Sequence, residues 1–373
     1  IVFIQDAAGK TLATSDDTPL LGHDCFVSLL VPADGKYIIQ LRDMAYAGAG
    51  HFYRMHVGTF PRPAVVFPLG GQPGETLQAR FLGDPSGEFT QAVTLPATPL
   101  SPVARFGALA DRDGLAPSPN WMRVIAAPNA EPVAPAATLG KAPLLDVPAP
   151  LAFNGVLSQK GDAAFFKFKA KKDQNLEFSV YARRLGSPLD SVLTVLDAKG
   201  KSLGNNDDAA GNPDSSVRVK ISEDGDYVVQ VADQLARGGP HFTYRVEITE
   251  VTPSLTLSIP DTARYDNETR KSLAVPRGNR FAVLLNLTRD TCNDELAVAF
   301  AGLPAGITML AETVPGSLSA VPVVFEAGAD APLAGNLLTP TAAPVDAAKA
   351  KNVTSRYRHG VEWVRIQNDT VYV

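Results

Sequence analysis

The sequence predicts an all-β protein built from several β-sandwich domains in series. Three observations carry this prediction. The 373 residues include 30 glycines and 30 prolines, which favours many short strands joined by turns. Stretches such as FFKFKAKK (165–172) and DYVVQVAD (226–233) alternate apolar and polar residues, as half-buried strands do. Turn signals such as AKGK, EDGD and RGGP recur at about ten-residue spacing, which is typical of antiparallel sandwiches.

An internal repeat sets the order of the domains. Residues 1–58 and residues 192–248 are two copies of one unit, and DGKYIIQLRD in the first matches DGDYVVQVAD in the second. Acidic residues recur in both copies: Asp16 and Asp17 pair with Asp207 and Asp208, and Asp24 pairs with Asp214. This organisation predicts the C-terminal half of a sandwich at 1–60, an immunoglobulin-like or TIG-like β domain at 61–126, an Ala/Pro-rich linker or edge-hugging segment at 127–149, a complete sandwich at 150–250 and an immunoglobulin-like sandwich at 251–373.

The first copy lacks the upstream part that the second copy has between about residue 150 and Asp190. Its strands would therefore leave an apolar edge unpaired. We predict that missing N-terminal residues, or a partner chain through a domain swap, complete this first domain. In the complete second copy, we expect the alternating apolar side chains to form the core: Phe166, Phe168, Phe178, Tyr227, Val229 and Val231.

The motifs YARRLGSPLDSVLTVLDAKGKSLGNNDDAAG, DGDYVVQVAD and GGPHFTYRVEI give the repeat its resemblance to a known family. The unit resembles the bacterial pre-peptidase C-terminal (PPC) domain, over about 150–250 and, as a half domain, over 1–58. The resemblance implies a jelly-roll-like β-sandwich in an exported protein that is secreted, periplasmic or at the cell surface. The whole order is similar to large exported proteins of planctomycete-type bacteria. Related collagen-binding domains of clostridial collagenases bind calcium and collagen.

The polar stretch LGNNDDAAGNPDSSV (203–217) is the candidate binding site, with calcium as its expected cofactor. Calcium takes six to eight oxygen ligands from carboxylates, amides and carbonyls. The alternative is a solvated turn in which Asp and Asn side chains bond nearby backbone amides. Residues of both copies are candidate metal ligands: Asp190, Asn205, Asn206, Asp207, Asp208 and Asp214 in the second copy, and Asp16, Asp17 and Asp24 in the first.

Other polar residues have two interpretations each. His51 and His241 occupy equivalent places and either ligate a metal or pack beside a strand end. Tyr181, Arg183 and Arg184 either form a recognition surface for a protein or polysaccharide, or combine a core tyrosine with solvated or salt-bridged arginines. Cys25 and Cys292 are expected to be free, buried thiols, with one long-range disulfide as the alternative.

Composition and motifs exclude several classes of function. A net charge of −5 disfavours nucleic acid as a partner, and no apolar run is long enough for a transmembrane helix. The sequence contains no HExxH, GxSxG, P-loop or GxGxxG motif. We therefore expect non-catalytic extracellular binding or spacer modules. The alternative is the accessory C-terminal region of a secreted peptidase whose catalytic domain lies outside these residues.

Overall fold

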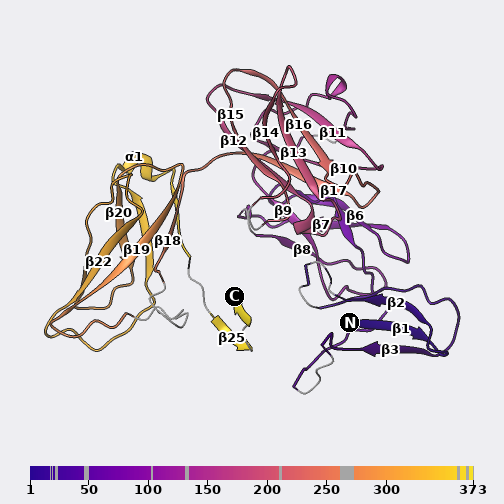
Figure 1. Cartoon of the computed structure of the whole chain (residues 1–373), viewed down its shortest axis with the longest axis horizontal. Helices are drawn as coiled ribbons and strands as arrows, with labels where there is room; N and C mark the ends of the chain where they lie inside the picture. Colours follow the sequence, from indigo (N-terminus) through magenta and orange to yellow (C-terminus); the bar gives the residue numbers. More distant parts are fainter. Residues whose placement is uncertain are drawn as a thin grey trace. The chain divides into compact units, whose positions relative to one another are not determined.

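The computed structural model describes residues 1–373 except 17, 19, 22–23, 46–49, 102–103, 131–133, 210–211, 261–272, 359–361, 367–368 and 373. The chain divides into two compact units, Ile1–Glu250 and Val251–Val373. The regular elements of both are almost all strands (Figure 1), so the all-β prediction is confirmed. Among the described residues, no helix has the length and apolar character needed to cross a membrane.

The main sandwich of the first unit consists of two four-stranded antiparallel sheets. The first sheet has the order β10-β17-β12-β15, with β10 (Leu151–Val156), β12 (Asn175–Tyr181), β15 (Ser216–Lys220) and β17 (Thr243–Glu250). The second sheet has the order β11-β16-β13-β14, with β11 (Ala163–Ala170), β13 (Ser191–Asp197), β14 (Ser202–Asn206) and β16 (Gly225–Asp233). A 3-10 turn, η2 (Arg183–Leu185), follows β12 and lies in the connection to β13.

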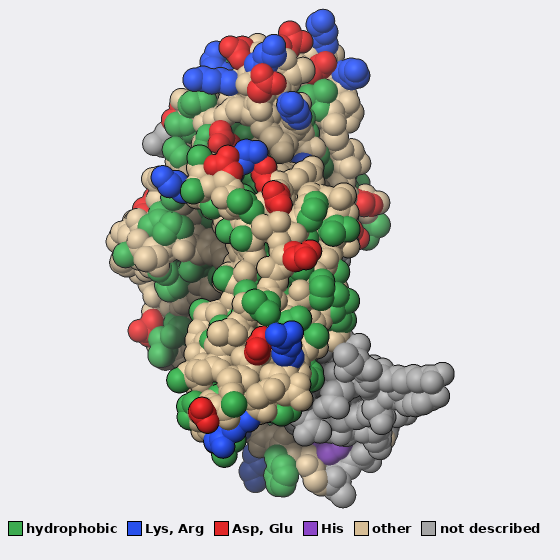
Figure 2. All heavy atoms as spheres, turned by 90° about the vertical axis from the view of Figure 1, so that its left-hand side faces the viewer, with side chains coloured by type: hydrophobic (Ala, Val, Ile, Leu, Met, Phe, Trp, Pro, Cys, Tyr) green, Lys and Arg blue, Asp and Glu red, His purple; other side chains and the backbone are tan. Residues whose placement is uncertain are grey.

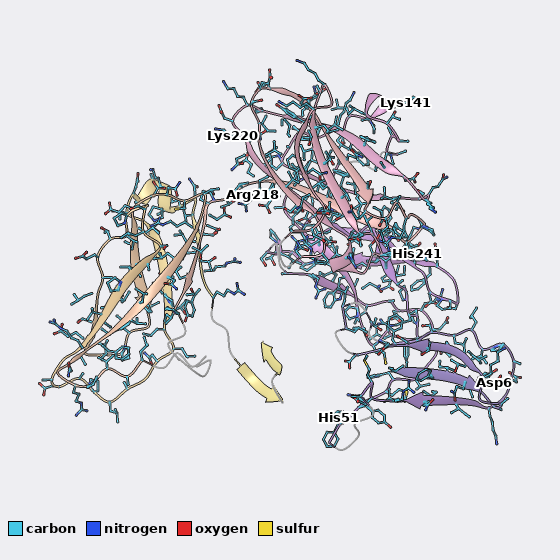
Figure 3. The ribbon with its side chains drawn as sticks, in the orientation of Figure 1. Asp6, His51, Lys141, Arg218, Lys220 and His241 are labelled. Atoms are coloured by element: carbon cyan, nitrogen blue, oxygen red, sulfur yellow. The ribbon has the colours of Figure 1, made fainter. Side chains whose placement is uncertain are left out.

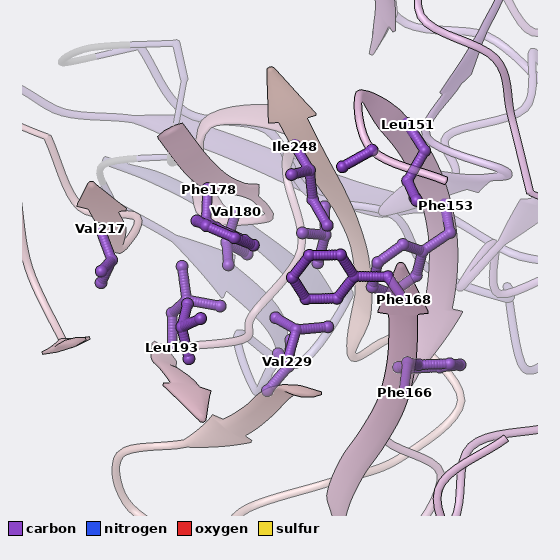
Figure 4. Packing of buried hydrophobic residues seen from close by; sticks show 14 of the residues in the cluster. Leu151, Phe153, Phe166, Phe168, Phe178, Val180, Leu193, Val217, Val229 and Ile248 are labelled. Atoms are coloured by element: carbon purple, nitrogen blue, oxygen red, sulfur yellow. The ribbon is translucent and has the colours of Figure 1, made fainter. Parts of the chain in front are cut away.

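The core of the main sandwich lies between the two sheets and follows the two-residue period of the strands. The six residues expected there are all buried (Figure 4): Phe166, Phe168, Phe178, Tyr227, Val229 and Val231. The ring of Phe168 contacts Phe178 edge-on, with 5.5 Å between the ring centroids. Each such aromatic ring contributes several kcal/mol of stability, since truncating a buried phenylalanine costs about 3–5 kcal/mol.

The segment 127–149 runs along the main sandwich as an edge-hugging chain. It forms isolated bridges to β11 between Ala136 and Phe165 and between Leu144 and Lys167. Near the 3-10 turn η1 (Leu139–Lys141), Ala142 packs on the outer side of the second sheet against Val228. This packing buries an apolar side chain that would otherwise face water.

The middle module, residues 61–126, contains two three-stranded sheets with the orders β4-β6-β7 and β5-β9-β8. Its strands are β4 (Val65–Phe67), β5 (Gly70–Gly71), β6 (Thr76–Leu82), β7 (Phe89–Thr94), β8 (Phe106–Ala108) and β9 (Asn120–Val124). Its apolar core also takes in Tyr181 and Leu185 from the main sandwich. The main sandwich therefore contributes two side chains to the core of the middle module, whereas its own core is a separate cluster.

The N-terminal sheet has the order β2-β1-β3, with β1 (Val2–Asp6), β2 (Thr11–Ser15) and β3 (Tyr37–Leu41). Asp6 lies at the turn between β1 and β2 (Figure 3). Both cysteines are free: Cys292 is buried as predicted, whereas Cys25 is only partly buried.

The second unit has a five-stranded sheet of order β21-β22-β19-β18-β24 and a two-stranded sheet of β20 and β23. The strands are β18 (Ser254–Ser258), β19 (Arg280–Asp290), β20 (Leu296–Ala301), β21 (Ile307–Leu310), β22 (Ala320–Ala327), β23 (Thr339–Pro344), β24 (Thr354–Tyr357) and the hairpin β25 (Glu362–Ile366) with β26 (Asp369–Tyr372). A single-turn helix, α1 (Ala347–Ala350), follows β23, and Asp346 caps its N-terminus. Phe300 and Phe325 meet edge-on in the core of this unit.

Candidate functional site

The polar stretch 203–217 runs from β14 into β15, and its described residues form local hydrogen bonds. Asn206 bridges its two ends: its Nδ2 donates to the Asp208 carbonyl at 3.0 Å, and its Oδ1 accepts from the Ser216 amide at 3.0 Å. Asp207 Oδ1 accepts from the amide of Asp208 at 3.0 Å. Asn205 donates to Thr194 Oγ1 at 2.6 Å on the neighbouring strand. These are the local side-chain to backbone bonds typical of Asn- and Asp-rich turns.

Asp214 is fully buried and binds the backbone of the turn after β12. Its carboxylate accepts hydrogen bonds from the amides of Ala182, Arg183 and Arg184 at 3.1, 2.7 and 3.3 Å. The Arg184 side chain adds a charged hydrogen bond from Nε at 2.8 Å. A buried carboxylate is stable only when such donors compensate its lost hydration. Asp214 therefore fixes η2 against the loop before β15.

Asp233, at the end of β16, has a closely similar environment, and its side chain is also fully buried. Its carboxylate accepts from the amides of Asp190, Leu235 and Arg237, and from the Arg237 guanidinium at 2.9 and 3.0 Å. Burial acts to raise the pKa of Asp233, but the Arg237 side chain and the backbone donors outweigh it, so the pKa lies below its ordinary value. Two buried aspartates, each held by amides and one arginine, thus stabilise this end of the main sandwich.

Asp233→Asn is expected to reduce stability by about 2 kcal/mol at neutral pH, because an uncharged amide replaces the acceptor of Arg237 and of three backbone amides. The folded pKa lies below the unfolded value of about 3.9, so this stabilisation is complete above pH of about 4 and disappears as pH falls through the folded pKa. Thermal unfolding between neutral and strongly acidic pH measures it. A difference between wild type and variant that stays constant over this range would contradict the assignment.

The structure separates the candidate ligands instead of gathering them around one point. Asp190 faces Arg183, whose Nη1 lies 3.1 Å from its Oδ1. Asp16 and Asp24 of the first copy are exposed, and Asp17 lies outside the described residues. Among the described residues, no group of three or more His, Cys, Asp or Glu side chains is placed to hold a metal ion. In this structure Arg183 is the counter-charge of Asp190 and Arg184 that of Asp214, and calcium at these two residues stays a prediction.

The remaining candidates divide between the two interpretations. Tyr181 is buried, and Arg183 and Arg184 form ion pairs, which agrees with the structural interpretation of this strand. His51 faces Asp43 at 3.3 Å and His241 lies 4.0 Å from Glu88, each beside one carboxylate (Figure 3 labels both histidines). Calcium at the exposed Asp207 and Asp208 stays a prediction.

The sequence reasoning missed a buried ionic cluster where the middle module meets the main sandwich. Arg123 of β9 and Arg245 of β17 both bind Glu247 of β17, at 3.1 and 2.9 Å, and the three side chains are at most 4% exposed. Arg123 also donates to the carbonyls of Ser101 and Ala104, and Arg245 donates to the carbonyl of Gly70.

The period of β17 explains this cluster. Tyr244, Val246 and Ile248 point into the core, so Arg245 and Glu247 point to the outer face of the sheet. That face is buried because the middle module covers it, and the guanidinium of Arg123 also lies 4.4 Å from the centroid of the Tyr181 ring. Burial and the charge of Glu247 raise the pKa of Tyr181 to about 12, against the opposing effect of Arg123 and Arg184. Arg245 and Glu247, two residues apart in an otherwise apolar strand, are the feature of the sequence from which this cluster could have been predicted.

Comparison with known proteins agrees with this fold. Residues 162–233, which lie in the main sandwich, match the bacterial pre-peptidase C-terminal (PPC) domain, and the main sandwich is called the PPC domain below. A probable subtilase-type serine protease of Deinococcus radiodurans is 40% identical over 78 residues, which are 21% of this chain and 11% of the protease. No catalytic domain is evident in the part of the chain that the structure describes.

Two solved structures are similar over the same share of the chain. One is the PPC domain of a collagenase from Bacillus anthracis, at 12% identity and a TM-score of 0.23. The other is PliG, a periplasmic inhibitor of g-type lysozyme from Aeromonas hydrophila, at 17% identity and a TM-score of 0.22. Each match covers 29% of this chain and 95% of the other.

Proposed function

We propose that the PPC domain and the middle module act together as one rigid, non-catalytic spacer or binding body of an exported bacterial protein. The observation that carries this proposal is the buried Arg123–Glu247–Arg245 cluster. Two modules joined only by a flexible linker tumble independently, whereas buried ion pairs and the packing of Tyr181 and Leu185 into the core of the middle module hold these two in one orientation.

Polar contacts beside the cluster support the same proposal. The Asn154 side chain of β10 accepts from the Leu69 amide at 3.1 Å and donates to the Gly70 carbonyl at 3.3 Å. Gly70 lies so close to β9 that a Cβ built on it would stand 2.3 Å from the Arg123 carbonyl oxygen. The close approach of these strands requires glycine at this position. A rigid body of this kind is suited to keep an attached domain at a fixed distance from a surface.

One face of the molecule carries mixed charges. On the face shown in Figure 2, acidic and basic side chains are interspersed and do not separate into patches of one sign.

Nuclear spin relaxation of the whole chain tests this function. Amides of residues 61–126 and 150–250 are expected to report the same rotational correlation time. The variant Glu247→Ala is expected to let the two values separate. Independent tumbling of the two modules in the wild-type chain would contradict the rigid-body proposal.

The second candidate function is the accessory region of a secreted peptidase, and the relative in Deinococcus radiodurans favours it. In that case the catalytic domain belongs to a longer parent polypeptide. The chain alone is expected to leave casein uncleaved in either case. Cosedimentation with insoluble collagen or cell-wall polysaccharide separates the binding version of the proposal from the spacer version.

A further inference from the structure

The N-terminal sheet reproduces three of the four strands of one sheet of the PPC domain. The order β2-β1-β3 corresponds to β14-β13-β16. In the first hairpin Val2 pairs with Ser15, and in the second Leu193 pairs with Asn206, at the equivalent register. Both hairpins also shift register at the same place, between Ile4 and Gln5 in the first copy and at the matching position of the second. A shared β-bulge is a specific structural feature that unrelated hairpins rarely have in common.

The turns of the two hairpins agree as closely. Asp6 Oδ1 accepts from the amides of Ala8 and Lys10, both at 2.9 Å. Asp197 Oδ1 accepts from the corresponding amides of Lys199 and Lys201, also at 2.9 Å. The glycine of each turn has a left-handed backbone, with φ of 83° and 86°.

The two copies differ in what covers them. Ile39 and Leu41 of β3 are 41% and 37% exposed, whereas their counterparts Val229 and Val231 are fully buried. The same contrast holds downstream, where Tyr53, Met55 and Val57 correspond to Tyr244, Val246 and Ile248. The first three are 73%, 42% and 71% exposed, and the last three are fully buried.

The topology of the PPC domain explains this contrast. Its strands β15 and β17 both pair with β12, which lies between them. The corresponding segments of the first copy, 25–31 and 51–57, are described residues that form no strand. A strand equivalent to β12 is the missing partner that both segments share. Without it, these segments form no sheet, and β3 keeps its apolar side chains exposed, although Val2 of the neighbouring β1 is buried.

Asp24 gives independent support. Its counterpart Asp214 is fully buried and binds the three amides that follow β12, whereas Asp24 is exposed. The first copy keeps the carboxylate, but the described residues offer no turn equivalent to η2 for it to bind. In the PPC domain, β12 and the turn η2 follow one another along the chain. One stretch of chain equivalent to β12 and η2 would therefore provide partners both for the two segments and for Asp24.

We propose that residues 1–58 are half of a second PPC-type sandwich, whose open apolar face docks a strand segment with the pattern of Leu151–Tyr181 followed by a turn like η2. Such a segment has alternating apolar residues, as in AAFFKFKA and NLEFSVY. It would add one strand beside β3, as β11 pairs with β16, and one strand between segments 25–31 and 51–57, as β12 lies between β15 and β17. A third strand would pair with the other side of segment 51–57, as β10 pairs with β17. Asp24 would then cap the turn that follows.

The chain supplies its own test. Residues 150–191, duplicated and joined directly to Ile1, reproduce the connection of Ser191 to Val192, since Ile1 corresponds to Val192. In this grafted chain, amide exchange in segments 25–31 and 51–57 is expected to slow by at least about tenfold, and binding of an apolar fluorescent dye is expected to fall. Unchanged exchange in both segments would overturn the proposal.

Two variants keep the test specific. A graft whose copies of Phe166, Phe168 and Phe178 are replaced by serine is expected to give no protection, because its strands cannot pack. Asp24→Ala is expected to leave the exchange rates of the ungrafted chain unchanged and to remove most of the protection gained by the graft. An equal effect of Asp24→Ala in both chains would contradict the capping role.

A second copy of this chain is the competing occupant of the face. Analytical ultracentrifugation of the ungrafted chain distinguishes it. A monomer with fast exchange in both segments supports the proposal. A dimer in which these segments are already protected would show that the face pairs with itself, and would overturn the proposal.

Discussion

Asp214→Ala is expected to destabilise the PPC domain by about 3–5 kcal/mol, because it leaves three backbone amides and the Arg184 guanidinium without their acceptor. For a unit of this size, the loss corresponds to a fall in Tm of roughly 6–20 °C. Thermal unfolding followed by circular dichroism measures it. Arg184 is partly exposed and regains hydration, so most of the loss comes from the buried amides. Asp214→Asn, which keeps one acceptor oxygen, is expected to lose less.

The matched control is Asp207→Ala, an exposed position in the same loop whose carboxylate accepts one local amide. Its effect on Tm is expected to be small in EDTA, since surface substitutions change stability by less than about 0.5 kcal/mol. Repeating both series in millimolar calcium tests the calcium prediction. A calcium-dependent rise in the wild-type Tm that Asp207→Ala abolishes would establish a metal loop, since a ligand of the folded state raises its midpoint. An Asp214→Ala effect that appears only in calcium would contradict the structural role of Asp214.

Glu247→Ala is expected to have the second large effect and to lower the free energy of unfolding by about 3–5 kcal/mol or more. The reason is that it leaves Arg123 and Arg245 buried without a counter-charge. Carbonyls of Ser101, Ala104 and Gly70 solvate the two guanidiniums but carry no full charge. Loosening of the junction is expected with the loss of stability, so limited proteolysis within residues 127–149 should become faster.

An apolar replacement of the whole cluster provides the control for Glu247→Ala. The triple variant Arg123→Met, Arg245→Met, Glu247→Leu removes all three charges together and is expected to be tolerated far better than the single change. A triple variant as unstable as Glu247→Ala would show that packing, and not the uncompensated charge, causes the loss. Calorimetry of both variants decides between the two.

The sequence predicted those parts of the structure that depend on short-range patterns. Alternation in β11 and β16 assigned Phe166, Phe168, Val229 and Val231 to the core, because the two-residue period of a strand is local. The turn from Asp197 to Gly200 was also predictable, because it depends on a few neighbouring residues.

The partners of the charged residues were not predictable in this way. Asp214 belongs to a polar run that is either a metal loop or a solvated turn by its sequence. Its donors come from Ala182 to Arg184, which only the pairing of β12 with β15 brings close. Glu247 lies in an apolar strand, and its partner Arg123 belongs to another module. Such contacts depend on the tertiary arrangement, and a single sequence carries no direct record of it.

The strand order of the PPC domain also has a consequence for the order of folding. Its first strand, β10, pairs with its last, β17, and β11 pairs with β16. These contacts join distant parts of the chain, and such topologies fold slowly. As the polypeptide leaves the ribosome, β10 must wait for its neighbour in the sheet, and β12 for one of its two neighbours, until Thr243–Glu250 has emerged. The domain therefore acquires its stability late, and a chain that stops short of β17 would be a target for chaperones and proteases.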